Sequence, residues 1–153
     1  MHELRKDPLL GRWVAVLNQS KSPSEYLLCP EANSEKDCLF CAGREMGLPQ
    51  EIMSIPQQDP GVLPKKWWTR VIPNLSPIFR IEGDLGRKGE GMYDKMNSIG
   101  ANEIIVESPY HDIRPEDIGL NQMARVLMTY RDRMADLEKD PRLRYTLIYK
   151  NSG

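Results

Sequence analysis

The sequence predicts an α+β domain with a mainly antiparallel sheet and one long helix. Three observations support this fold class. Runs of β-branched and aromatic residues recur along the chain, one amphipathic helix occurs near its end, and proline- and glycine-rich stretches separate these elements. A length of 153 residues suits one domain that buries its own core.

Four runs have the composition and length of strands, and turn residues bound them. They cover residues 13–17, 65–72, 103–107 and 143–149. Weaker strand candidates are residues 51–55 and 78–81. Residues 4–8 are polar, and we expect a leader that packs on another part of the molecule. The region 83–100 contains five glycines among charged residues, which predicts a long flexible loop.

The helix is the clearest element. Apolar side chains recur at steps of three and four, as an amphipathic helix requires; they are Met123, Val126, Leu127, Tyr130, Met134 and Leu137. Asn121 is the expected N-cap, and Asp140-Pro141 ends the helix. Three arginines fall between these positions and are expected on the solvated face; they are Arg125, Arg131 and Arg133.

Composition excludes several classes of protein. The formal net charge is −1, so no global field attracts nucleic acid or an anionic membrane. No run of eighteen apolar residues is present to span a bilayer, and the charged N-terminus lacks the apolar region of a signal peptide. Three cysteines, two of them in a CxxC pair, predict a reducing, cytoplasmic setting rather than a disulfide framework.

Cys38-Leu39-Phe40-Cys41 is the strongest chemical signal. Two thiolates at this spacing can bind one zinc ion, which needs four ligands. The pair lies in an irregular, proline-rich region, which favours a zinc knuckle over a redox motif or two unliganded thiols. His111 follows a predicted strand and is a candidate third ligand. Cys29 is an alternative, although a small buried apolar group is its more ordinary role.

Two further groups of residues have ordinary explanations beside functional ones. Trp67-Trp68 could stack on a base, and Lys65-Lys66 precede them. No basic stripe continues from there, so strand alternation, with one ring in the core and one over a sheet edge, is the better interpretation. Asn74 and Asn151 each close a strand, and their amides suit either a turn or a nucleotide.

Several stretches, in order along the whole chain, resemble the galactose-1-phosphate uridylyltransferases. The N-terminal stretches are Glu3-Leu4-Arg5-Lys6-Asp7-Pro8, Gly11-Arg12-Trp13-Val14 and the CxxC pair. The later ones are residues 70–74, residues 103–109 with His111, residues 130–133 and residues 149–153. The similarity is greatest to the branch that also resembles ADP-glucose phosphorylase.

This resemblance implies a histidine-triad-like half, an antiparallel sheet with helices. Members of the family move a nucleoside monophosphate between a nucleotide sugar and a sugar phosphate, or phosphate, through a covalent nucleotidyl-histidine. It further implies that Cys38, Cys41 and His111 are three of four zinc ligands. Phe40, Asn74 and Asn151 would contribute to the nucleotide pocket, and family members commonly form homodimers.

The sequence also departs from the family pattern. The Ser…His-Pro-His-x-Gln motif, which carries the fourth zinc ligand and the nucleophile, would follow Gly153. The arginines of the first loop are missing, and only Lys21 remains there as a candidate phosphate contact. We therefore expect residues 1–153 to be the N-terminal domain of a nucleotidyltransferase of the UDP-glucose:hexose-1-phosphate type. We assign it no catalytic residue and expect no activity from this chain alone.

Two alternatives to this expectation remain. One is a non-catalytic, zinc-stabilised domain that binds nucleotides. The other is a redox protein that uses the CxxC pair and binds no metal.

Overall fold

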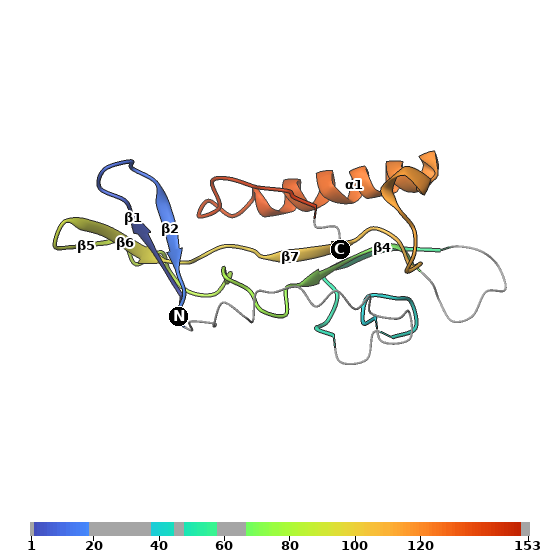
Figure 1. Cartoon of the computed structure of the whole chain (residues 1–153), viewed down its shortest axis with the longest axis horizontal. Helices are drawn as coiled ribbons and strands as arrows, with labels where there is room; N and C mark the ends of the chain where they lie inside the picture. Colours follow the sequence, from blue (N-terminus) through green and yellow to red (C-terminus); the bar gives the residue numbers. More distant parts are fainter. Residues whose placement is uncertain (1, 19–37, 45–47, 58–66, 151–153) are drawn as a thin grey trace.

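A computed structural model of the chain describes residues 2–18, 38–44, 48–57 and 67–150. Within these ranges the strands form two antiparallel sheets, and one long helix lies over the second sheet (Figure 1). This arrangement confirms the α+β fold class predicted from the sequence.

The second sheet is the centre of the molecule. Its order is β3 (Met53–Pro56), β4 (Trp67–Pro73) and β7 (Glu103–Val106), with β4 between the other two strands. The firm runs at 65–72 and 103–107 are therefore confirmed as strands, as is the weaker candidate at 51–55. Residues 65–66 of the first run lie outside the described residues. Because β4 is covered on both faces, the largest fully buried side chains include its residues Thr69, Val71 and Ile72.

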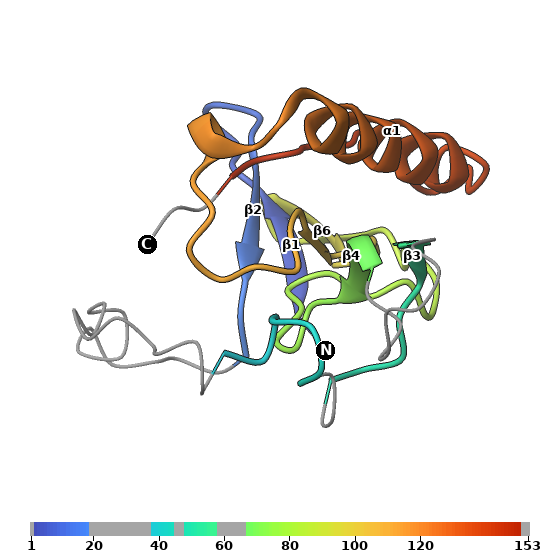
Figure 2. The same ribbon diagram turned by 90° about the vertical axis from the view of Figure 1, so that its right-hand side faces the viewer.

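Helix α1 (Leu120–Leu137) packs against β4 (Figure 2). Its buried residues are Val126, Thr129 and Arg133. The Thr69 and Thr129 hydroxyls lie 2.8 Å apart across this interface. The helix begins after Gly119 rather than after Asn121, and it ends at Leu137, before Asp140. The inner face is also rotated from the predicted one, because Leu127 is 57% exposed.

The four-stranded first sheet has the order β2-β1-β6-β5 and is built from two hairpins (Figure 1). Strands β1 (Glu3–Lys6) and β2 (Trp13–Val16) form one hairpin, and β5 (Lys88–Glu90) and β6 (Tyr93–Asn97) form the other. The strand predicted at 13–17 is confirmed. The polar leader at 4–8 and the flexible loop at 83–100 are corrected, because the first contributes to β1 and the second contains both β5 and β6.

A tight turn explains the second hairpin. Glu90 pairs with Tyr93, so Gly91 and Met92 alone form the loop. Gly91 has φ +62°, and no residue other than glycine has positive φ among the described residues. A positive φ at the first turn position only is the geometry of a type II′ turn, which matches the twist of the flanking strands. The glycines of this region therefore make a turn as well as loops.

Two other strand predictions are wrong. Residues 143–149 form no strand, and Tyr145, Leu147 and Tyr149 are exposed. Residues 78–81 contribute only a single bridge between Arg80 and Ile99. Among the described residues β7 pairs with β4 alone, so the β-branched and aromatic composition of 143–149 has no ladder to join there. No described helix is both long and apolar enough to cross a membrane.

A close ion pair follows α1 and leads to a prediction about pH. The side-chain hydrogen bonds from Arg142, assisted by its backbone N–H, lower the pKa of Asp140 from 3.8 to about 2. Since the folded pKa lies below the unfolded value, this pair stabilises the fold above about pH 4 and ceases to do so as the pH falls towards 2. We expect the Asp140 carboxyl to titrate near pH 2 by carbon-detected NMR.

Asp140→Asn is the matching variant. It should lose the pH dependence of urea unfolding that Asp140 contributes between about pH 4 and 2, because no carboxylate remains to be protonated. Asp132→Asn, which alters the exposed ion pair between Asp132 and Arg131 on α1, is the control. A titration midpoint of Asp140 at 3.8 or above would contradict the assignment.

Candidate metal centre

The CxxC pair forms a tight turn outside the sheets. The backbone N–H of Arg44 donates to the Cys41 carbonyl at 3.2 Å, and Gly43 has φ +87°, a conformation that favours glycine. The backbone N–H groups of Phe40 and Cys41 also hydrogen-bond the Cys38 sulfur. Amides that surround a sulfur in this way stabilise its thiolate, so the local chain already suits a metal-bound cysteine.

His111 reaches the same place from the end of β7. The chain leaves the sheet after Val106, and Tyr110 turns back by donating its N–H to the Ser108 hydroxyl at 3.1 Å. The Ala42 N–H donates to the Pro109 carbonyl at 3.4 Å, which joins this loop directly to the knuckle. The prediction that His111 follows a strand is confirmed.

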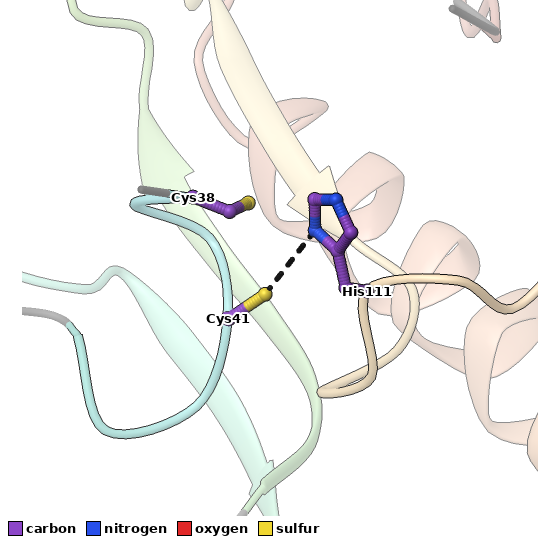
Figure 3. Close-up of side chains that lie close together, drawn as sticks. All are labelled: Cys38, Cys41 and His111. Carbon is purple, nitrogen blue, oxygen red and sulfur yellow. Dashed lines mark hydrogen bonds between the residues drawn. The ribbon is translucent and has the colours of Figure 1, made fainter. Parts of the chain in front are cut away.

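The three candidate ligands converge (Figure 3). The His111 Nδ1 atom lies 3.5 Å from the Cys41 Sγ atom, and the three ligand atoms of Cys38, Cys41 and His111 lie within 4.8 Å of one another. In tetrahedral zinc sites with such ligands, the donor atoms are about 3.5–3.8 Å apart. One separation already matches, and a contraction of at most about 1 Å would bring all three into range. Two sulfurs and an imidazole nitrogen are also the donor set that zinc prefers.

The electrostatics of the site favour ionised sulfur. Burial by itself raises the pKa of the Cys38 thiol, but the hydrogen bonds from the Phe40 amide, the His111 ring and Cys41 together lower it by more. The pKa of Cys38 is therefore held below the ordinary thiol range. A thiolate is the form of cysteine that binds metal, so the site is prepared for a cation in the folded chain.

The predicted nucleotide residues do not all lie at this centre. Phe40 is half-buried between the two cysteines. Asn74 lies beside Asn102, at the end of the β4–β7 pair where β7 begins, whereas His111 follows the other end of β7. The side chain of Asn74 donates to Asn102 at 2.8 Å and accepts from the Ser76 N–H at 3.0 Å. Asn151, Cys29 and Lys21 lie outside the described residues.

Glu107 and Gln122 make contacts near the start of the His111 loop that no sequence motif predicts. The Glu107 carboxylate accepts a hydrogen bond from the Tyr130 hydroxyl and forms an ion pair with Lys150. The Gln122 amide donates to the Glu107 carbonyl and to the Trp68 carbonyl, each at 2.6 Å. The sequence around Gln122 gives no signal of this role, because the two acceptors lie elsewhere in the chain, Trp68 in β4 and Glu107 directly after β7.

Two curated proteins are similar to the chain along its whole length. It is 29% identical over 157 residues to ADP-glucose phosphorylase from Arabidopsis thaliana, a match that covers 99% of this chain and 43% of that protein. It is 25% identical over 154 residues to galactose-1-phosphate uridylyltransferase from Thermotoga maritima, covering 100% of this chain and 42% of the relative. No family model matches the sequence.

Solved structures agree with these relatives. The crystal structure of the Arabidopsis thaliana ADP-glucose phosphorylase with bound ADP-glucose has a TM-score of 0.58 at 29% identity, covering 95% of this chain and 41% of that one. A galactose-1-phosphate uridylyltransferase-like protein from the same plant has a TM-score of 0.56 at 28% identity, covering 93% and 38%. The homologues are therefore those that the motifs predicted, and the chain spans about 43% of the length of the first.

Proposed function

We propose that this chain forms the zinc-containing part of a nucleotidyltransferase that acts on nucleotide sugars and sugar phosphates. The observation that carries this proposal is the assembly of Cys38, Cys41 and His111. These residues come from two motifs 70 positions apart that the resemblance had already singled out. Similarity to ADP-glucose phosphorylase and to galactose-1-phosphate uridylyltransferase over the whole chain supports the same reaction class.

Zinc would have a structural role in this arrangement. Cys38, Cys41 and His111 would hold it, and the bound ion would connect the knuckle to the loop after β7, two segments with few apolar residues of their own. The fixed knuckle would in turn present Phe40 to a base. Asn74 and Asn151 would bind the rest of the nucleotide. A reducing compartment such as the cytoplasm would keep both thiolates available.

The sequence contains no His-Pro-His motif, which carries the nucleophile in the family that the motifs resemble. It contains two histidines, of which His111 belongs to the metal centre, and the His2 ring accepts the Asn18 N–H at 3.3 Å beside the first sheet. We therefore expect binding without turnover by these 153 residues. The lack of a free histidine motif for catalysis also suits the second candidate function, a non-catalytic, zinc-stabilised domain that binds nucleotides.

Nucleotide-sugar binding by the 153-residue chain tests the proposal. We expect ADP-glucose or UDP-glucose to shift the backbone amide signals of Phe40 and Asn74 in NMR titrations of the zinc-loaded protein. The affinity should be weaker than about 1 μM, since the chain supplies only part of a pocket. Glucose 1-phosphate without a nucleoside serves as the control ligand, and it should leave the Phe40 signal unchanged.

A pair of asparagine variants tests the location of the site. Asn74→Ala should weaken nucleotide binding, whereas Asn97→Ala should not. Asn97 is the matched control, because its amide also closes a loop, by donating to the Asp84 carbonyl at 2.8 Å in the first sheet. Shifts confined to the first sheet, or sub-micromolar binding, would contradict the proposed pocket.

A further inference from the structure

We infer that Gln122 and Tyr130 are positioning residues for His111, and that helix α1 aims this ligand at the CxxC pair through Glu107. This inference rests on the proposed zinc site and assigns it a support that lies outside the ligands. The metal affinity of the site would then depend on contacts made by a helix that contributes no ligand.

The first step of the argument concerns where the sheet ends. The β4–β7 ladder runs to the pair of Arg70 and Val106, and Glu107 and Trp68 lie just beyond it. There the Gln122 side chain donates to the Trp68 carbonyl in β4 and to the Glu107 carbonyl directly after β7, each at 2.6 Å. The Gln122 amide thus binds the two carbonyls at the point where hydrogen bonding between β4 and β7 stops. These bonds fix the place at which the chain leaves β7.

The orientation of the Gln122 amide is determined by its neighbours. Its nitrogen faces two carbonyl oxygens, so a flipped amide would place oxygen against oxygen. In the observed orientation Gln122 Oε1 is buried and has no hydrogen-bond partner among the described residues. An unpartnered buried oxygen costs free energy, so the two donated bonds must offset this cost as well.

The second step concerns the Glu107 side chain. Its carboxylate accepts the Tyr130 hydroxyl, while Lys150 pairs with the other oxygen. Burial raises the pKa of Tyr130 above its ordinary value, and the hydrogen bond to Glu107 raises it as well. The hydroxyl therefore keeps its proton and donates at neutral pH. Helix α1 therefore holds Glu107 at both its main chain and its side chain.

The third step connects Glu107 to the ligand. Only Ser108, Pro109 and Tyr110 separate it from His111, and this short loop is held at Pro109 by the knuckle and turned at Tyr110 by Ser108. A loop fixed at one end by α1 and in the middle by the knuckle has little freedom to move His111. Groups that hydrogen-bond a metal ligand directly change metal affinity by about 10–100-fold, and the contacts to Glu107 act on His111 one step further away, so we expect an effect near the lower end of that range.

The molecule contains a matched control at the other end of the same strand. Glu103 begins β7 and is also bound by α1, through two bonds to Arg133 at 2.7 and 2.9 Å. The two glutamates thus make comparable contacts to one helix, but only Glu107 continues into the His111 loop. A general loss of stability should follow from changes at either end, and a loss of metal geometry only from changes at Glu107.

The experiment compares Gln122→Leu and Tyr130→Phe with Glu103→Gln in the full chain. Zinc dissociation constants are measured by competition with a chromophoric chelator, and Co²⁺ absorption spectra report the ligand geometry. We expect Gln122→Leu to raise the zinc Kd about tenfold and to alter the cobalt spectrum. Tyr130→Phe, which removes one oxygen and should fold, is expected to act in the same direction by a smaller factor.

Glu103→Gln should lower the melting temperature but leave the zinc Kd and cobalt spectrum like those of the wild type. Wild-type metal binding in both Gln122→Leu and Tyr130→Phe would overturn the inference. Equal weakening by Glu103→Gln would overturn it too, since metal affinity would then follow stability alone.

A measurement without metal separates this inference from the zinc proposal. In the metal-free wild type, nuclear Overhauser effects between the His111 ring and the Cys41 β-protons should be present. They should be lost in Gln122→Leu and retained in Glu103→Gln. If the wild type binds no zinc and this pattern is observed, the positioning role stands and the zinc proposal fails. If the effects persist in Gln122→Leu, the positioning role is wrong.

Discussion

Cys41→Ser is expected to abolish stoichiometric zinc binding and to lower the stability of the zinc-loaded chain by about 4 kcal/mol. This magnitude follows from mass action when free zinc is about 1,000-fold above the wild-type Kd. For a domain of this size it corresponds to a fall of about 10 °C in melting temperature. Cys41 is 7% exposed and its sulfur contacts His111, so a serine there leaves two ligands that cannot complete the site.

The measurement is elemental analysis of the purified protein together with melting curves in zinc and in chelator. Wild-type protein should melt lower in chelator, whereas Cys41→Ser should melt at one temperature in both. Cys29→Ser is the matched control, since it makes the same chemical change elsewhere in the chain. If Cys41→Ser retains one zinc per chain and the wild-type melting temperature, the metal centre is misassigned. Zinc loss in Cys29→Ser would add Cys29 to the ligands.

The metal centre shows what a local pattern can and cannot predict. Two cysteines separated by two residues form a knuckle by themselves, so spacing alone predicts that half of the site. His111 contacts Cys41 across 70 positions of the chain, and the fold rather than any local pattern brings the two together. The residue type and its place after a strand made His111 a candidate, and the family resemblance made it the expected ligand.

The first sheet was the part of the fold that the pattern concealed. Strands β1, β5 and β6 consist largely of polar and charged residues, and β5 is exposed throughout. Such strands carry no strong alternation of apolar and polar residues, because neither face is deeply buried. The turn at Gly91 was the one local signal, and the surrounding glycines obscured it.

The opposite error occurred at residues 143–149. Leucine, isoleucine and tyrosine in this segment give it a strand composition, yet a strand also needs a partner with which to exchange backbone hydrogen bonds. Composition describes the preference of a segment, whereas pairing depends on which other segments lie beside it. The second condition is a property of the folded chain, and no window of the sequence contains it.

Arg133 is the clearest case of a residue assigned to the wrong environment. The sequence placed it on the solvated face of the helix with Arg125 and Arg131, but its side chain is 11% exposed and forms an ion pair with Glu103. Arg125 instead lies over the Trp68 ring at 4.4 Å, and Arg131 is exposed beside Asp132. A helical pattern records hydrophobicity, so a buried cation whose partner lies on a distant strand is counted as surface.

Arg133→Met is therefore expected to lower the free energy of unfolding by about 3–5 kcal/mol. The Glu103 carboxylate, 13% exposed, would be left without the two bonds that Arg133 donates at 2.7 and 2.9 Å. The attraction within a buried pair is largely cancelled by desolvation, but the loss of one partner leaves the full desolvation cost of the other. Urea unfolding at pH 7 in chelator measures this effect apart from any metal.

The desolvation cost of an unpaired Glu103 carboxylate predicts how two further variants should behave. Arg131→Met makes the same change at an exposed position of the same helix and should alter stability by no more than about 0.5 kcal/mol. The double variant Arg133→Met with Glu103→Leu should be more stable than Arg133→Met alone, because no unpaired charge remains in the interior. If the double variant is the less stable of the two, favourable contacts of the ion pair, rather than the cost of an unpaired carboxylate, hold α1 on β7.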